Sequence, residues 1–186
     1  QNPVWITADD PSGDETNTWI EFRKEFKLKK IPKKAEAHIA ADTKYWLWVN
    51  DSLAVFEGGL KRGPNRRDTY YDVIDIAPYL RKGENDVRII LWHFGRQGFS
   101  HSDSGQSGII VNVPSVGLVS DASWKSRRLN TYQSCGEPST NFRLAESSIR
   151  YDARLEGMDD FRPSLEICGW NEGVWGKLVK RPIPQW

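Results

Sequence analysis

Apolar and polar side chains alternate along residues 19–28, and this is the clearest local pattern in the chain. The even positions are Ile20, Phe22, Lys24, Phe26 and Leu28. The odd positions after Trp19 are all charged. A period of two is typical of a β-strand with one buried face and one face in water. A second alternation of small and branched residues over 35–41 follows a turn at 31–34 and predicts a second strand.

The rest of the chain also reads as short strands separated by turns. Residues 45–56 predict a β-hairpin with its polar turn at 50–52, and further strands are expected at 70–76, 87–92, 109–113 and 116–119. Residues 77–83 predict one helical turn closed by Gly83 in the left-handed cap position. Two long exposed loops are expected at 57–67 and 93–108.

This pattern predicts an all-β fold, an antiparallel β-sandwich of jelly-roll type. Beyond Gly136 only short extended runs stand out, at 148–151 and 173–180. Residues 1–180 are expected to form one domain, and residues 181–186, with their two prolines, the start of a linker to a missing catalytic domain.

Composition narrows the function classes. The chain has 186 residues with 26 Lys+Arg against 25 Asp+Glu, a net charge of +1, so it offers no basic surface for a nucleic-acid backbone. No segment approaches the roughly 18 consecutive apolar residues of a membrane-spanning helix. Aromatic residues make up 12% of the chain and include 9 Trp. Such side chains suit both a sandwich core and a surface on which sugars stack.

The sequence contains no recognisable motif for binding a metal ion or a cofactor. His93 and His101 with Asp103 could meet in one loop, but no His-x-His, His-Glu-x-x-His or paired-Cys spacing is present. The sequence therefore predicts no cofactor and no metal; oxygen-only calcium sites leave little trace in a sequence. Cys135 and Cys168 allow one disulfide, which the sequence does not decide.

Acidic residues are candidate catalytic groups because a glycosidase needs two carboxyl groups roughly 5–10 Å apart. The best local candidates are Asp152, Glu156, Asp159 and Asp160. Arginines flank this cluster, which favours ion pairs in a solvated loop. No catalytic residue is predicted in this chain.

Residues 92–101 are the strongest candidate for contact with a ligand. They follow a strand directly and combine aromatic rings, two imidazoles and a guanidinium with glycines, groups that can stack on and hydrogen-bond a polar ring. Trp46, Arg62 and Asn65 could contact the same ligand if the loops at 57–67 and 93–108 lie at the same end of the sandwich. The predicted carbohydrate-binding residues are Trp46, Arg62, Asn65, Trp92, His93, Arg96, Phe99 and His101. The alternative is that these rings anchor the loop to its own domain.

Several motifs resemble a known family. Tyr45-Trp-Leu-Trp-Val-Asn-Asp51 and the segments 71–75 and 80–87 are similar to the N-terminal, galactose-binding-like β-sandwich of multidomain glycoside hydrolases. Val119-Ser-Asp-Ala-Ser-Trp-Lys125 and Ile149-Arg-Tyr-Asp-Ala-Arg154 resemble two signatures of bacterial α-L-rhamnosidases. Residues 181–184 resemble their exit linker. Asp51 stands where the hairpin usually has Gly, and a left-handed turn tolerates Asp better than most residues.

The resemblance implies a jelly roll that precedes an (α/α)-barrel carrying the catalytic Glu residues. The chain is then a non-catalytic module of a secreted or periplasmic α-L-rhamnosidase-type glycoside hydrolase. Its partners would be the catalytic domain of the same polypeptide, on whose barrel it packs, and rhamnose-containing or other plant or host glycans. Two alternatives stay open: a free-standing carbohydrate-binding module, and a small jelly-roll glycan lyase or hydrolase that uses Asp152 or His101.

Overall fold

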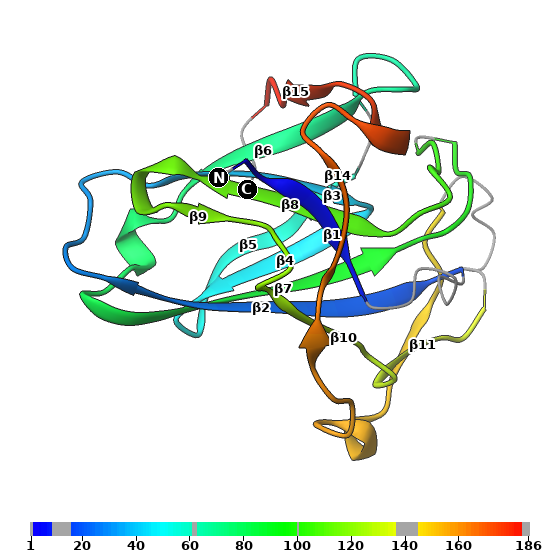
Figure 1. Cartoon of the computed structure of the whole chain (residues 1–186). Coiled ribbons are helices and arrows are strands. Elements are labelled where there is room, and N and C mark those ends of the chain that lie inside the picture. Colours follow the sequence, from blue (N-terminus) through cyan, green and yellow to red (C-terminus); the bar gives the residue numbers. More distant parts are fainter. Residues whose placement is uncertain (1, 9–15, 61–62, 100, 137–144, 184–186) are drawn as a thin grey trace.

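The computed structural model describes residues 2–8, 16–60, 63–99, 101–136 and 145–183, and they form an all-β sandwich (Figure 1). The predicted fold class is confirmed. Within the described part, no helix is long and apolar enough to cross a membrane. The strands are β1 Val4–Thr7, β2 Thr18–Leu28, β3 Glu36–Asp42, β4 Lys44–Val49, β5 Ser52–Gly59, β6 Thr69–Asp75, β7 Gly83–His93, β8 Gly108–Val113, β9 Leu118–Val119, β10 Lys125–Arg128, β11 Tyr132–Ser134, β12 Ile149–Tyr151, β13 Arg162–Pro163, β14 Leu165–Gly169 and β15 Leu178–Lys180.

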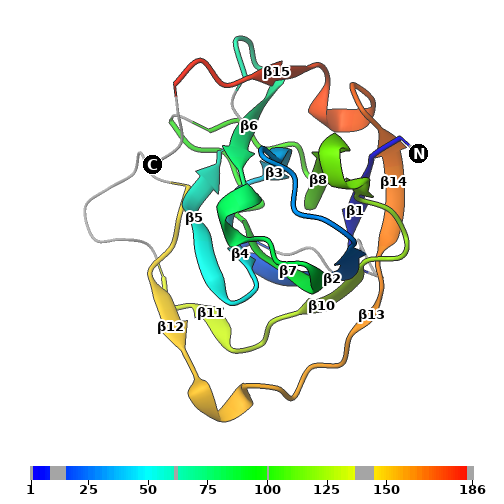
Figure 2. The same ribbon diagram turned by 90° about the vertical axis from the view of Figure 1, so that its left-hand side faces the viewer.

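Two sheets face each other. The seven-stranded sheet has the order β14-β1-β8-β3-β6-β15, with β9 also paired to β8, and the six-stranded sheet has the order β13-β10-β2-β7-β4-β5. Every pairing is antiparallel except that of β15 with β6. Strands β11 and β12 form a separate pair, which Figure 2 shows beside the β4–β5 hairpin at the edge of the six-stranded sheet. Short 3-10 turns lie at Ala77–Tyr79, Pro114–Val116, Ala153–Leu155 and Gly173–Trp175.

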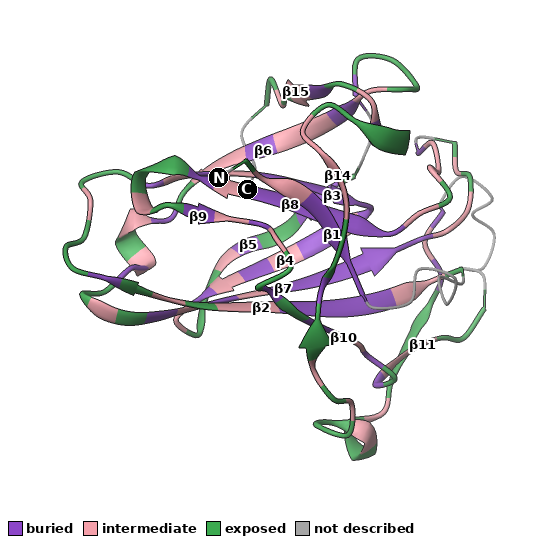
Figure 3. Ribbon diagram, viewed as in Figure 1, coloured by how far each residue is buried: buried purple, intermediate pink, exposed green. Residues whose placement is uncertain are grey.

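The core between the sheets follows the alternation in the sequence. Ile20 and Phe22 of β2 are fully buried there against Ile39 and other apolar residues of β3, while Phe26 is half-buried. Burying one such large side chain contributes about 1.5–3 kcal/mol. Figure 3 shows the first part of β2, the second half of β7 and most of β8 as buried.

The charged face of β2 is only partly in water, which corrects the expectation of a fully wet face. Trp19 and Glu21 are buried. Trp19 packs with Ile90 and Trp92 of β7 in a second apolar cluster on the outer side of the six-stranded sheet, and Leu129 and Ala145 cover it. The cover comes from a segment more than 100 residues further along the chain.

The outer side of the seven-stranded sheet carries a third cluster. Trp5 of β1 and Trp175 stack with their ring centroids 4.0 Å apart and their planes at 13°. Ala40, Ile110 and Leu178 complete the cluster. Both outer faces therefore bury tryptophan, so much of the aromatic content serves packing.

The turns show which local predictions were right. Asn50 and Asp51 both have positive φ, 49° and 64°, so the β4–β5 hairpin has the predicted turn, and Asp51 occupies a left-handed position. Gly83 also has a positive φ, but it begins β7, and the helical turn ends earlier with Leu80 as its cap. Of the strand expected at 116–119, only Leu118 and Val119 are extended.

Strand β5 runs further than expected. Gly58 and Gly59 were placed in an exposed loop, yet they belong to β5 and are buried. A Cβ at Gly58 would overlap the ring of Tyr45. The absence of a side chain thus lets the strand lie directly on that ring, which is why a glycine-rich stretch forms part of the core.

Asp72 ties this region to β15. Its carboxylate accepts hydrogen bonds from the Tyr45 hydroxyl and the Gly59 backbone N–H, both at 2.9 Å, and from the Arg181 guanidinium. The residue at the expected start of the linker therefore makes a buried contact with the domain. Residues 184–186 lie outside the described part of the chain.

Candidate carbohydrate-binding site

The two loops that the sequence analysis singled out meet at one end of the sandwich. They enclose a hollow of about 360 Å³. The residues that line it are Gly63, Pro64, Asn65, Arg66, Gln97, Gly98, Phe99, His101 and Ser102. We call this hollow the end pocket.

The end pocket offers one exposed ring beside amide and guanidinium groups. The side chain of Phe99 is 79% exposed, and Asn65, Arg66 and Gln97 are exposed as well. The Asn65 amide donates to Asp68 at 2.5 Å, and Gln97 hydrogen-bonds the backbone of Asp103. These groups can stack on and hydrogen-bond a polar ring.

A buried carboxylate anchors the loop that forms one wall of the pocket. Asp42, at the end of β3, accepts hydrogen bonds from Ser104 Oγ at 2.6 Å and from Trp175 Nε1 at 3.2 Å. Thr43 Oγ1 lies 3.1 Å and His93 Nδ1 3.4 Å from its other oxygen. Burial acts to raise the pKa of Asp42, but the hydrogen bonds with His93 and Ser104 outweigh it and the pKa is lowered.

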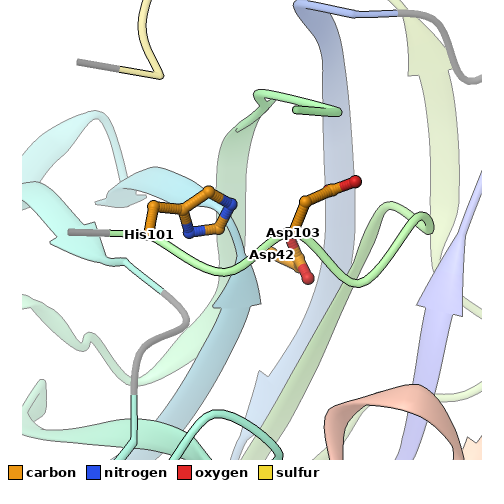
Figure 4. Close-up of side chains that lie close together, drawn as sticks. All are labelled: Asp42, His101 and Asp103. Carbon is orange, nitrogen blue, oxygen red and sulfur yellow. The ribbon is translucent and has the colours of Figure 1, made fainter. Parts of the chain in front are cut away.

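Asp42, His101 and Asp103 gather closely enough to be considered as a metal site, as Figure 4 shows. Their ligand atoms lie within 4.8 Å of one another. The sequence pointed to His101 and Asp103 but not to Asp42. Four protein donors already face the four lone-pair positions of the Asp42 carboxylate, so we interpret it as a structural tie between loop and sheet.

The eight predicted residues fall into distinct places. Asn65, Phe99 and His101 line the end pocket, where His101 is 5% exposed and forms a T-shaped contact with the Phe94 ring at 5.4 Å between centroids. Arg96 is half-buried and is not among the lining residues. Arg62 lies outside the described residues.

Trp92 and His93 are buried, do not line the end pocket and face other parts of the domain. Trp92 is 4% exposed, stacks on Trp19 at 5.3 Å between centroids and donates its Nε1–H to Asn17 at 3.1 Å. His93 is 1% exposed and contacts Asp42. We therefore leave both out of the proposed contact surface. Trp46 lies on the outer face of the six-stranded sheet.

Arg66 and Gln97 line the pocket but were not among the predicted residues. Each is adjacent to one that was: Arg66 follows Asn65, and Gln97 follows Arg96 within the 92–101 segment. Both residues could have been found by counting every polar residue of the two loops as a candidate, because polar neighbours of the predicted residues line the same pocket.

The acidic cluster at 152–160 is held by partners. Asp152 forms an ion pair with Arg154 at 2.6 Å, and the hydrogen bond from Arg154 lowers the pKa of Asp152 to about 2. Asp159 accepts a hydrogen bond from Asn130 at 2.6 Å. This agrees with the interpretation of these residues as ion pairs and solvated loop. Cys135 and Cys168 are free thiols, so no disulfide joins them.

Comparison with solved structures gives the fold its relatives. The chain is similar to the GH78 family rhamnosidase of Bacillus sp. GL1, with a TM-score of 0.83 and 26% identity over 100% of this chain and 20% of that chain. It also resembles the native α-L-rhamnosidase from Aspergillus terreus (TM-score 0.68, 22% identity, 96% of this chain and 22% of that one). A lectin from Pleurotus ostreatus shares the fold more distantly (TM-score 0.50, 20% identity, 96% of this chain and 46% of that one).

These matches define the class as a β-sandwich domain like one found within α-L-rhamnosidases. The resemblance seen in the sequence motifs is thereby confirmed. The chain spans only about a fifth of the length of the rhamnosidases that it matches. No protein-family model matches the sequence, and no curated protein matches it either.

Proposed function

We propose that this chain is a non-catalytic β-sandwich domain of a larger α-L-rhamnosidase-type glycoside hydrolase, with a saccharide-binding site in its end pocket. The observation that carries the proposal is the similarity to the Bacillus rhamnosidase, which covers all of this chain and one fifth of that enzyme. The partner would be the catalytic domain of the same polypeptide, against which this domain packs. We extend the proposal to a secreted or periplasmic location, where large rhamnose-containing glycans of plants or hosts are met.

The non-catalytic part of the proposal rests on the chemistry of the pocket. Hydrolysis of a glycosidic bond needs an acid and a second carboxylate across the scissile bond. No Asp or Glu is among the described residues that line the end pocket. Asp152 is paired with Arg154, and His101 is almost fully buried, so neither is placed as a free acid or base for a lyase or hydrolase of its own.

The binding part rests on the exposed ring of Phe99 and the polar rim around it. A saccharide presents C–H groups on its faces and hydroxyls on its edges, so a ring flanked by amide and guanidinium donors suits it. Asn65 and Gln97 are already hydrogen-bonded to neighbouring residues, which holds their amides in place.

Calorimetric titration of the chain with L-rhamnose and with rhamnose-containing oligosaccharides tests the binding. We expect saturable binding that weakens by about tenfold in Asn65→Ala and in Phe99→Ala. Lys33→Ala, an exposed change in the β2–β3 turn, serves as the control and should bind as the wild type does. Binding unchanged by both pocket variants contradicts the assignment of the site.

A hydrolysis assay tests the assignment of the chain as non-catalytic. The isolated chain should not hydrolyse an aryl α-L-rhamnoside, and measurable hydrolysis that is lost in Asp152→Asn or His101→Ala would establish the small-enzyme alternative instead. A free-standing carbohydrate-binding module is distinguished by its gene, because such a module is encoded without a catalytic domain.

A further inference from the structure

We propose a second saccharide site on the outer face of the six-stranded sheet, an aromatic groove that takes a neutral oligosaccharide. Sugar rings would stack on Trp46 and Trp48, and Arg88 would donate hydrogen bonds to their hydroxyls. This site lies on a strand face, away from the loops of the end pocket, and goes beyond the function proposed above.

The register of the strands places these residues side by side. Strand β4 pairs with β7 so that Trp46 lies opposite Ile90 and Trp48 lies opposite Arg88. Residues directly opposite one another on neighbouring strands point to the same face of a sheet. Two tryptophans on β4 therefore border an apolar and a charged side chain of β7.

The hollow between the β4–β5 hairpin and the β11–β12 pair has a volume of about 340 Å³. Buried Trp19 and Ile90 form its floor. Trp46, Trp48 and Phe56 line it from the hairpin, and Tyr132 and Ile149 line it from the β11–β12 pair. Its lining is almost wholly apolar, and Phe56 is 62% exposed.

A polar hollow of about 280 Å³ adjoins this groove and shares Ile90 and Tyr132 with it. Arg88 lines the polar hollow, and its guanidinium lies 4.2 Å from the centroid of the Trp48 ring. A ligand that spans both hollows therefore meets flat rings at one end and hydrogen-bonding groups at the other.

Arg88 has donors to offer. Within the described part of the chain, its guanidinium makes the contact with Trp48 and no hydrogen bond or ion pair with a carboxylate. The neighbouring arginines differ, because Arg23 and Arg127 both bond to the buried carboxylate of Glu21. Arg88 lines the polar hollow, and its guanidinium carries five N–H donors.

The charges favour a neutral ligand. Arg88 and Arg127 line the polar hollow together with three acidic residues, Glu21, Glu156 and Asp159, so a carboxylate on the sugar would meet more repulsion than attraction. Hydroxyl groups can accept from Arg88 and donate to Glu156. An apolar protein surface would fill the aromatic end but would leave the arginine buried without acceptors, which is unfavourable. A saccharide satisfies both ends.

The test is titration of the chain with neutral hexasaccharides of β-1,4-linked glucose, xylose and mannose, followed by calorimetry and by tryptophan fluorescence. At least one should bind with a dissociation constant of about 1 mM or lower, and Trp48→Ala and Arg88→Ala should weaken it about tenfold or more. Phe56→Ala removes an exposed ring with little risk to folding and should also weaken binding. Lys125→Ala, at an exposed position of β10, is the control and should leave binding unchanged.

The proposals for the groove and for the end pocket can be refuted independently of each other. Loss of hexasaccharide binding in Asn65→Ala and Phe99→Ala, with no effect of Arg88→Ala and Phe56→Ala, overturns the groove and leaves the end pocket intact. Absence of binding by all three hexasaccharides also overturns the groove. So does concentration-dependent dimerisation that Phe56→Ala abolishes, since the face would then be an interface between two copies.

Discussion

The end pocket and the outer-face groove show two ways of presenting aromatic rings on one sandwich. The end pocket is built from loops, and its ring, Phe99, stands in water on a segment anchored through Asp42. The groove is built from strands, and its tryptophans are held by a hydrogen-bonded ladder. Rings on strands are positioned before a ligand arrives, whereas loop rings can adapt to it.

The difference also teaches how to interpret tryptophan in such a chain. Trp92 has the sequence context of a ligand-binding ring because it borders a loop, yet it is buried and stacks on Trp19. Trp48, which the sequence marked only as a strand residue, remains half exposed on β4, as does the predicted binding residue Trp46. Proximity to a loop is thus a weaker guide to exposure than the cover that other segments provide.

The largest expected effect tests whether Trp92 is core. Trp92→Ala removes a buried ring that stacks on Trp19, so it should lower the free energy of unfolding by about 3–5 kcal/mol. Denaturant unfolding followed by circular dichroism measures this. Wild-type stability together with lost saccharide binding would place Trp92 in a binding surface and remove the contrast between the two kinds of ring.

The next effect concerns the anchor of the end pocket. Asp42→Ala leaves the buried Trp175 Nε1–H without its acceptor and removes one partner each from Ser104 and His93, which keep the carbonyl oxygens of Gln106 and residue 42, so we expect a loss of about 3 kcal/mol. Arg88→Ala, at the groove, is the comparison and should cost far less.

The pH dependence of the Asp42 contribution has a definite sign. The pKa of Asp42 is lowered in the folded state. Its contribution is therefore fully present above the unfolded value of about 3.9 and is lost as the pH falls through the folded pKa. Urea unfolding at a series of acid pH values should show a shallower acid decline in Asp42→Ala than in the wild type; equal slopes would refute the assignment.

A smaller effect is expected at the groove. Arg88→Ala removes the contact of the guanidinium with Trp48, which is worth about 0.5–1 kcal/mol at a partly exposed site. Arg88→Lys is the matched variant and should retain part of this stability. A loss above about 2 kcal/mol would mean that Arg88 serves the fold itself rather than an open site.

The smallest effect is expected for the loop ring. Phe99→Ala should change the free energy of unfolding by less than about 0.5 kcal/mol, since the ring is 79% exposed. The same chemical-denaturation assay applies. A substantial destabilisation would show that the loop depends on this ring for its packing, which would contradict the role of Phe99 as an exposed contact surface of the end pocket.

The sequence predicted what depends on neighbours in the chain. The period-two pattern of residues 19–28 located β2, and the Asn50-Asp51 pair located the hairpin turn, because strand alternation and turn geometry are set within a few residues. The sequence left open whether the two loops lie at the same end of the sandwich, and the structure brings them together there.

Burial by segments that are far away in the sequence could not be predicted in the same way. Glu21 looked like a wet residue, but Arg127 bonds its carboxylate from more than 100 residues away. Asp42 gave no signal because its partners come from β7, from the loop after it and from Trp175 near the C-terminal strand. Such contacts depend on topology, which a local pattern does not contain.

The stack of Trp5 on Trp175 has a consequence for how the domain assembles. It joins the first strand to a turn near the last, and β1 also lies between β8 and β14. Closing contacts across nearly the whole chain has a high entropic cost and slows folding. On a ribosome the earliest residues would wait for the latest ones, so the sandwich should acquire its final structure only after synthesis has passed Trp175.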